Sequence, residues 1–416
     1  MLIKRRQILQ GLACTPLMMR SLAAEAAAAN DTIVVVVALN GGNDGLNTVV
    51  PLTQYAAYNA LRSPAGAGGS IAYLRPQLSA TAFNSNPATA PASSTQFAFA
   101  PTMVPMRQLY ATGKLAVIAG IGFPGAELQP QSHFNGFSDW STGQINVDSS
   151  AIPAGWLGAA LAGTAPGALG TTASIDGGQL VASSTAGQGL VVDRPGNFNL
   201  SVPYYIPQFT LGDAYQKMLN VRATTAAATL AQSVSNATLN AVGAMQDFAQ
   251  LAGDYPSTSS ELGQQLQVIA QMIMGRAGIR GYAASAGGYD THSNQAGTHP
   301  QLLADLSTAI QQFYTYLQKK NLSKNVVIVT ISDFGRTTGA NFSLGTDHGT
   351  ASVAFVLGDA VKGGVYGSYP SLTKLDSDNN LVVHVDFRNM LSDIIVAMGG
   401  NATTVLGQTY PKLGFI

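Results

Sequence analysis

The chain is short of charge. Asp, Glu, Lys and Arg make up only 10% of its 416 residues, whereas about a quarter is usual in globular proteins. The 21 basic and 21 acidic residues balance, and no long run of one sign occurs. This excludes a phosphate-facing basic surface, so we expect no nucleic-acid partner. Ser, Thr, Asn, Gln and Gly must cover much of the surface, which suits a protein that works outside the cytoplasm.

Glutamate and cysteine are nearly absent. The glutamates are Glu25, Glu127 and Glu261, so almost every carboxylate is a short aspartate. Aspartates suit loops, helix caps and metal shells better than helix faces. The single cysteine, Cys14, lies in an N-terminal segment that we expect to be removed. The mature chain then has no thiol, which excludes disulfides and a cysteine nucleophile.

Several catalytic motifs are also missing. The sequence has no GxSxG elbow, no Walker loop, no GxGxxG after its first predicted strand and no HExxH pair. The first three are the signatures of α/β-hydrolases, P-loop nucleotide enzymes and dinucleotide enzymes, and the last is that of a large class of zinc proteases. The sequence therefore gives no support for any of these four enzyme classes.

Residues 1–29 have the pattern of an export signal. A basic start with paired arginines, Arg5 and Arg6, precedes a weakly apolar stretch and an alanine tract that offers a cleavage site. The arginine pair favours the twin-arginine route, and an ordinary secretory signal is the alternative. The apolar stretch is too short for a stable membrane span. We therefore expect a periplasmic or secreted protein without a transmembrane segment.

Residues 30–416 are expected to form one α/β domain. The β-branched run at 32–39 predicts a buried central strand of a parallel sheet. Further strands are predicted at 115–121, 280–285, 325–331 and 352–357, and helices at 103–110, 262–274, 301–319 and 387–398. This alternation predicts an α/β/α sandwich with a mostly parallel central sheet. Residues 63–100 are expected to form a long surface excursion, and about 200–275 a helical cap, an insertion or a set of outer helices.

Three short clusters in the last third of the chain combine aspartate with histidine or arginine. They are YDTH at 289–292, SDFGR at 332–336 and TDHG at 346–349. Each adjoins the end or the start of a predicted strand, so we expect all three to meet at one edge of the sheet. Carboxylates and imidazoles there predict a site for one divalent metal ion, Zn, Mn or Ca. The alternative is that the aspartates only cap turns and helices.

Four more residues are candidates for the site, and three of them have two interpretations each. Asp44 follows the first strand and is either a ligand or part of a tight turn. Ser132 is either a helix N-cap or a nucleophile, and His133 beside it is a candidate for proton transfer. Arg336 either holds an anionic substrate group or forms a surface ion pair. The complete set of predicted metal ligands is Asp44, Asp290, His292, Asp333, Asp347 and His348.

These motifs resemble an exported bacterial family of unknown function, number fifteen-oh-one, whose members usually carry a twin-arginine signal. The resemblance is carried by VVVVALNGGNDGLNTVVP (34–51), QSHF (131–134), GWLG (155–158), GGYDTHSNQ (287–295), TISDFGRT (330–337), GTDHGT (345–350) and VLGDAVKGGVYG (356–367). That family is considered similar to the alkaline phosphatase and sulfatase superfamily. The resemblance therefore implies an alkaline-phosphatase-like fold, with metal-bound Asp and His at the sheet edge and a Ser, Thr or modified Cys nucleophile.

Carried over residue by residue, the resemblance makes Asp290, His292 and His348 ligands of one metal. It puts Asp44, Asp333 and Ser132 on the side of a second metal or of the nucleophile. The chain departs from the superfamily in having Asn40 where the first strand usually ends in Asp, and Phe334 where a histidine follows the other Asp. These departures favour one metal over two.

Two functions remain open from the sequence. One is an exported metal-dependent hydrolase of a phosphate or sulfate ester, with a small molecule or a glycan as its substrate. The alternative is a non-catalytic exported protein that keeps the fold for binding or surface assembly. The sequence specifies no protein partner for either function.

Overall fold

The structure is a computed structural model that describes residues 31–66, 68–88, 96–125, 132–146, 153–164, 170–175, 180–183, 189–192, 248, 251 and 253–416. The export signal predicted for 1–29 lies outside these residues. So does most of the cap or insertion predicted for 200–275, apart from its C-terminal part. No helix of the described residues is long and apolar enough to cross a membrane.

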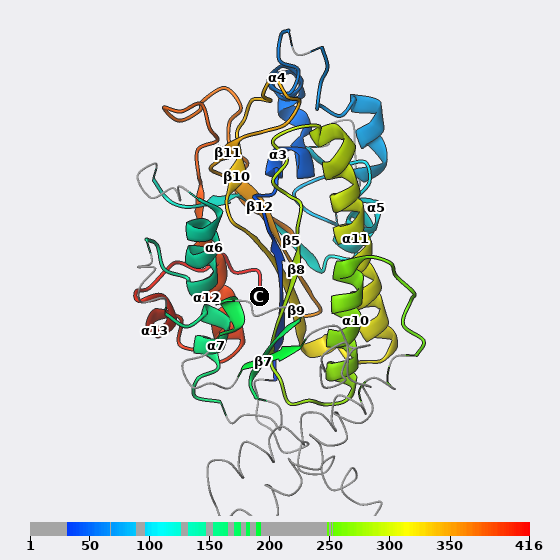
Figure 1. Ribbon diagram of the computed structural model, residues 1–416, viewed down its shortest axis with the longest axis vertical. Helices are drawn as coiled ribbons and strands as arrows, with labels where there is room; N and C mark the ends of the chain where they lie inside the picture. The colour runs from blue at the N-terminus through cyan, green and yellow to red at the C-terminus, as the bar shows by residue number, and fades with distance from the viewer. Residues whose placement is uncertain are drawn as a thin grey trace, which may run out of the picture.

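A mixed sheet of nine strands among the described residues runs through the middle of the protein (Figure 1). Its order is β13-β5-β12-β9-β1-β8-β6-β7, with β14 paired to β5. The strands are β1 (Ile33–Leu39), β5 (Leu115–Gly122), β6 (Thr172–Ile175), β7 (Gly189–Val192), β8 (Gly281–Ala286), β9 (Val326–Ser332), β12 (Ser352–Gly358), β13 (Gly364–Gly367) and β14 (Val385–Asp386). Strand β12 is antiparallel to both neighbours, and the other pairs are parallel. The predicted mostly parallel sheet is confirmed.

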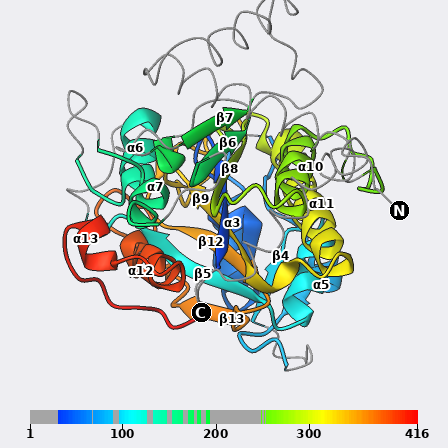
Figure 2. The same ribbon diagram turned by 90° about the horizontal axis from the view of Figure 1, so that it is seen from below.

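Helices cover both faces of this sheet (Figure 2). One face carries α5 (Val104–Ala111), α10 (Glu261–Met274) and α11 (Gln295–Lys319), and the other carries α6 (His133–Thr142), α7 (Trp156–Ala160), α12 (Phe387–Ala397) and α13 (Ala402–Leu406). Strand β1 serves both layers, because Val35 and Val37 face one core while Val34 and Val36 face the other. Each such valine contributes about 1.5–3 kcal/mol by its burial. The predicted α/β/α sandwich is therefore confirmed.

The described part of 45–100 lies beside the sandwich, and its Leu46, Val50, Tyr58 and Leu78 belong to a third apolar cluster. This part contains α3 (Gly45–Thr48), β2 (Val49–Pro51), η2 (Leu52–Gln54), α4 (Tyr55–Leu61), η3 (Arg75–Thr81), β3 (Ala82–Phe83) and β4 (Phe97–Phe99). Strands β2, β4 and β3 make a small sheet, and the stacked rings of Phe83 and Phe99 lie 4.3 Å apart. The prediction of a surface excursion at 63–100 is thus wrong for its described parts. A few large apolar residues are buried there among the small ones that suggested a loop.

Helix α11 begins at Gln295, six residues before the predicted start. The prediction placed the boundary after Pro300, which lies inside the helix. A proline lacks the N–H that a helix interior needs, but near the N-terminus few such bonds are lost. The additional turn matters because it brings Gln295 and His299 into the buried interior.

The pairing register places five chain segments at one edge of the sheet. Leu39, the last residue of β1, lies opposite Ala286 of β8 and Ser332 of β9, so these three parallel strands end at the same level. Antiparallel β12 begins at that edge, where Ser352 pairs with Ile121 near the end of β5. The loops after β1, β5, β8 and β9 and the loop before β12 therefore all meet there.

Candidate metal centre

Side chains from four of these loops converge above the sheet edge. His133 opens α6, which follows β5, and His292 lies six residues after β8. Asp333 directly follows β9. His348 belongs to β11 (His348–Gly349), which pairs with β10 (Gly335–Arg336) in the loop before β12. The predicted convergence of the three acidic clusters is what the structure shows.

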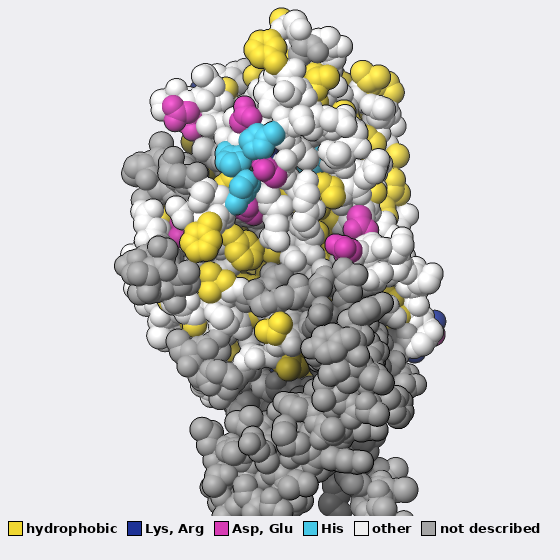
Figure 3. Space-filling model, viewed as in Figure 1, with side chains coloured by type: hydrophobic (Ala, Val, Ile, Leu, Met, Phe, Trp, Pro, Cys, Tyr) yellow, Lys and Arg dark blue, Asp and Glu magenta, His cyan; other side chains and the backbone are white. Residues whose placement is uncertain are grey.

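Three histidine rings surround one carboxylate oxygen, Oδ1 of Asp290. The distance to Oδ1 from Nε2 of His292 is 3.0 Å, and from Nε2 of His133 and of His348 it is 3.4 Å each. In Figure 3 the histidine side chains gather beside carboxylates on one face of the protein. The three rings are 36–44% exposed and Asp290 is 45% exposed. A small ligand can therefore reach this histidine cluster from solvent.

Two further carboxylates hold the opposite nitrogens of the rings. Nδ1 of His133 lies 2.7 Å from Oδ2 of Asp333, and Nδ1 of His292 lies 2.9 Å from Oδ1 of Asp347. A carboxylate accepts hydrogen bonds, so we assign the ring proton to Nδ1 in both histidines. Each Nε2 then keeps a lone pair directed at the cluster. Carboxylates in this position are the usual support of metal-binding histidines.

The distances within the cluster fit a divalent ion. Ligands held about 2.0–2.1 Å from a tetrahedral zinc ion lie about 3.3 Å from one another. The distances among Oδ1 of Asp290, Nε2 of His292 and Nε2 of His348 are 3.0, 3.1 and 3.4 Å. His133 offers a fourth donor, since its ligand atom and those of Asp290 and His348 all lie within 4.8 Å of one another. Its Nε2 is buried without a hydrogen-bond partner.

The electrostatics favour the protonation states that a metal needs. Burial opposes ionisation of Asp290, but the hydrogen bond and charge of Arg336 outweigh it and lower the pKa of this carboxyl group. Burial, followed by the charge of Arg336, lowers the pKa of His348. An ionised Asp290 and a neutral His348 are both metal-binding forms. Burial raises the pKa of Asp333, against hydrogen bonds from His133 and the Gly41 N–H.

Arg336 joins the loops through all three of its guanidinium nitrogens. It is buried, and it donates to the carbonyl oxygens of Gly42 at 2.8 Å and of Thr346 at 3.0 Å. Its Nη2 also donates to the Tyr289 carbonyl, to the Gly41 carbonyl and to Asp290. The sequence suggested a grip on an anionic substrate or a surface ion pair. The structure shows an ion pair with the half-exposed Asp290, made by a guanidinium that is enclosed by the loops that it connects.

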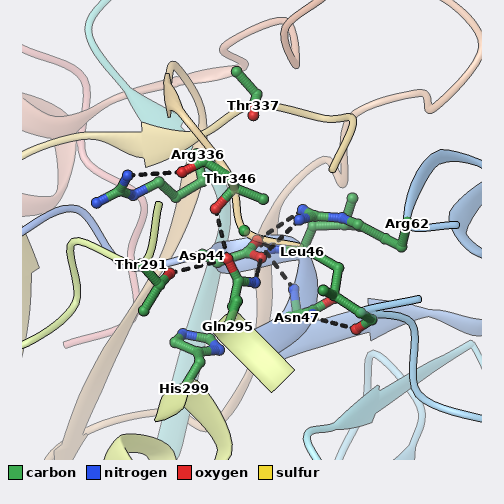
Figure 4. Close-up of polar contacts among 12 residues, drawn as sticks. Asp44, Leu46, Asn47, Arg62, Thr291, Gln295, His299, Arg336, Thr337 and Thr346 are labelled. Atoms are coloured by element: carbon green, nitrogen blue, oxygen red, sulfur yellow. Dashed lines mark hydrogen bonds and ion pairs between the residues drawn. The ribbon is translucent and has the colours of Figure 1, made fainter. Parts of the chain in front are cut away.

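Asp44 belongs to a separate buried network with Arg62 and Gln295 (Figure 4) and not to the histidine cluster. It is buried, and Arg62 donates to both of its oxygens at 2.8 Å. Its Oδ1 also caps α3 by accepting from the N–H groups of Leu46 and Asn47. Burial would raise the pKa of Asp44, but the charge of Arg62 lowers it overall. The prediction that Asp44 is a metal ligand is corrected, because its oxygens accept hydrogen bonds from Arg62 and from the first turn of α3.

Ser132 and Asp333 occupy supporting positions. The Ser132 hydroxyl accepts a hydrogen bond from the N–H of Asn135 at 3.2 Å, which is the capping role that the sequence left open beside the nucleophilic one. Asp333 and Asp347 contact the outer nitrogens of the rings rather than their shared centre. The sequence assigned His133 to catalysis alone. Its place after the strand at 115–121, at the same sheet edge, was the signal that its ring would lie beside His348.

Phe334 fills the place where the resemblance led us to expect a histidine. Its ring is buried and packs against the rings of His133 and His348, with centroid distances of 4.9 and 4.5 Å. An apolar ring supplies no ligand, but it limits the directions in which the two imidazoles can turn. This favours the single ion expected from the sequence.

Two glycines allow the loops to approach so closely. Gly41 has a φ of +114°, and a Cβ there would overlap the backbone nitrogen of Asp290. A Cβ on Gly345 would overlap the backbone carbonyl group of His292. Gly41 and Gly345 are thus required because any larger residue would push these loops apart.

Comparisons with known proteins give a family but no activity. A family model described as "Protein of unknown function (DUF1501)" matches residues 31–410, and no curated protein matches the chain. Ps i-CgsB, crystallised with k-i-k-neocarrahexaose, is 9% identical and the match covers 93% of this chain and 75% of that one, with a TM-score of 0.41. A protein in the alkaline phosphatase superfamily from Vibrio parahaemolyticus is 10% identical over 91% and 71%, with a TM-score of 0.37.

PsFucS1 sulfatase from Pseudoalteromonas sp. is 12% identical over 89% of this chain and 70% of that one, with a TM-score of 0.36. All three TM-scores lie below 0.5. These likenesses therefore carry no argument about what the residues of this chain do.

Proposed function

The chain belongs to the DUF1501 family of proteins of unknown function, and on that premise we propose that it is an exported, metal-dependent hydrolase of phosphate or sulfate esters. One observation carries the proposal. Three Nε2 atoms face Oδ1 of Asp290, while carboxylates hold the Nδ1 atoms of two of the rings. The export part rests on the signal pattern of residues 1–29.

The proposed ligands are Asp290, His292 and His348, with His133 as the fourth. A bound divalent ion would supply Lewis-acid polarisation of an ester oxygen. Asp333 and Asp347 keep the rings of His133 and His292 in the tautomer that offers Nε2. His133 then binds the ion rather than moving protons.

The charge distribution explains why the ion would be needed. Arg336 is the cation paired with the cluster among the described residues, and its donors are already engaged. An anionic ester would therefore find its positive partner in the ion itself. Removal of the ion by a chelator should abolish hydrolysis completely rather than weaken it.

The nucleophile in this proposal is either Ser132 or a water molecule. Ser132 lies at the N-terminus of α6, next to the ligand His133, and its hydroxyl accepts one hydrogen bond and can still donate one. Ser132→Asn keeps an N-capping side chain but removes the hydroxyl. If this variant is inactive although it binds metal, Ser132 attacks the ester; if it keeps its activity, water does.

The test combines metal analysis with an ester screen. The protein is purified after export, its metal content is measured by mass spectrometry, and 4-nitrophenyl phosphate and sulfate esters are assayed with each of Zn, Mn and Ca. His292→Ala combined with His348→Ala should lose both metal and hydrolysis. His384→Ala is the matched control, because His384 is exposed and lies outside the cluster. A wild-type protein that binds none of the three metals would refute the proposal.

The second candidate is a non-catalytic exported binding or surface-assembly protein. Two exposed aromatic residues favour it. Phe134, 58% exposed, follows His133, and Phe342, 79% exposed, follows Asn341, which donates to Asp347. Exposed rings beside a polar site are typical of binding surfaces. This function predicts that Phe134→Ala with Phe342→Ala abolishes capture of a glycan by the metal-loaded protein, and that no ester is hydrolysed.

A further inference from the structure

Gln295, the first residue of α11, links the two loops that carry His292 and His348 (Figure 4). Its Oε1 accepts from the hydroxyl of Thr291 at 2.9 Å and from the hydroxyl of Thr346 at 2.7 Å. Thr291 immediately precedes His292, and Thr346 lies two residues before His348. Gln295 and both threonines are buried. One amide oxygen thus connects both loops below the histidine cluster.

A buried ion pair fixes the orientation of this amide. Nε2 of Gln295 donates to Oδ2 of Asp44, which is held by Arg62. The ionised carboxylate can only accept hydrogen bonds, so the NH2 group of the amide must face it. The amide oxygen is then directed at the two hydroxyls, which can donate. The charge of Asp44 therefore makes the amide oxygen of Gln295, and not its NH2 group, face the two loops.

The backbone supports the same contact. The N–H of Thr346 donates to the carbonyl of Thr291 at 3.0 Å, and the N–H of Gln295 donates to the carbonyl of Leu344 at 2.8 Å. The two loops would consequently stay adjacent without the Gln295 side chain. What the side chain adds is a fixed separation, so its loss should alter the geometry of the cluster and not the fold.

We propose that Gln295 is a positioning residue of the metal centre. Through the chain Arg62–Asp44–Gln295 it sets the separation of the two loops, and thereby the distance between Nε2 of His292 and Nε2 of His348. The effect on metal affinity rests on the proposed function. The effect on the two rings does not, and it can be measured in the metal-free protein.

The first arm measures zinc affinity by calorimetry. Gln295→Met keeps the approximate volume and removes the hydrogen bonds, and we expect it to weaken zinc binding about 10–100-fold, as the loss of other supporting groups does. Gln271→Met is the control, because Gln271 is also a buried helical glutamine, but its amide donates to the Leu251 carbonyl and to neither of the two loops. It should keep the wild-type affinity. Equal zinc affinity in Gln295→Met and wild type would overturn the proposal.

The second arm records the ring nitrogens of 15N-histidine-labelled protein without metal. The chain has five histidines, so their signals can be assigned by single substitution. Gln295→Met should shift the His292 and His348 signals and leave His384 unchanged. Thr346→Val, which removes one hydroxyl at equal volume, should act in the same direction, and Thr346→Ser should restore the spectrum.

The two arms separate the possible failures. If the wild-type protein binds no metal but the His292 and His348 signals move in Gln295→Met, the metal function is refuted and the positioning role stands. Unchanged signals in both Gln295→Met and Thr346→Val refute the positioning role whatever the metal result. If Gln295→Met does not fold, Thr346→Val decides alone.

Discussion

Nε2 of His292 lies 3.1 Å from Nε2 of His348, although 56 residues separate them in the chain. Two lone pairs cannot face each other at this distance without a proton or a cation between them. Asp347 holds the other nitrogen of His292, and burial with the charge of Arg336 lowers the pKa of His348. The proposed function would place its metal ion between these two nitrogens.

The first prediction concerns Asp347, which orients the His292 ring. Asp347→Ala should weaken zinc binding about 10–100-fold, because His292 loses the acceptor that fixes its tautomer. Asp347→Asn should fall between this variant and wild type, since an amide oxygen can still accept from Nδ1. Calorimetric titration with zinc measures the effect. Asp378→Ala, at an exposed site away from the cluster, should change nothing; an equal loss in that control would contradict a specific role.

Much of this arrangement follows from local sequence signals. The apolar runs that became β1 and β9 are buried on both faces, and such strands can be recognised without knowledge of their partners. Parallel strands end at a common edge, which brings Asp290 and His292 after β8 near Asp333 after β9, and antiparallel β12 begins at that edge just after His348. The family resemblance, confirmed by the match over residues 31–410, added the same residues independently.

The remainder depends on contacts that a sequence does not display. Asp44 looked like a ligand because it follows a strand, but Arg62 folds back from α4 to neutralise it. Asp333 and Asp347 looked like ligands because they lie beside the histidines, and only the ring orientations show that they contact Nδ1. Pro300 led us to predict that α11 starts at residue 301, so the start of the helix with Gln295 was missed.

The second prediction concerns the buried ion pair of Asp44 and Arg62. Asp44→Asn should lower the free energy of unfolding by about 3–5 kcal/mol, because a fully buried guanidinium is left without its counter-charge. Chemical denaturation measures this difference. Asp254→Asn is the control, since Asp254 pairs with Lys320 at the surface and its loss should change stability little. A small effect of Asp44→Asn would mean that solvent reaches Arg62.

The third prediction concerns the cap of α6. Ser132→Ala should lower the free energy of unfolding by about 1 kcal/mol, because the N–H of Asn135 loses its acceptor. Ser132→Asn should restore most of this loss, since asparagine is an equally good cap. Thermal unfolding of the metal-free variants measures both changes without reference to activity. Equal destabilisation by alanine and asparagine would show that the hydroxyl has another structural partner.

The fourth prediction concerns the pH dependence of stability and His299. This ring is fully buried and bonds to Asn43 through Nε2 at 3.0 Å. Burial lowers the pKa of His299 from 6.5 to about 4, and the charge of Asp44 only partly offsets this. At a pH between these two pKa values, His299 binds a proton in the unfolded chain but not in the folded protein.

The stabilising contribution of a neutral His299 is therefore complete above pH 6.5 and is lost progressively as the pH falls towards 4. A difference of this size corresponds to about 3 kcal/mol. Urea denaturation of wild type and His299→Gln across this range measures it, because glutamine does not titrate. The free energies of unfolding of the two proteins should converge as the pH falls. Parallel pH profiles would show that His299 is already protonated in the folded protein, with Asp44 as its counter-charge.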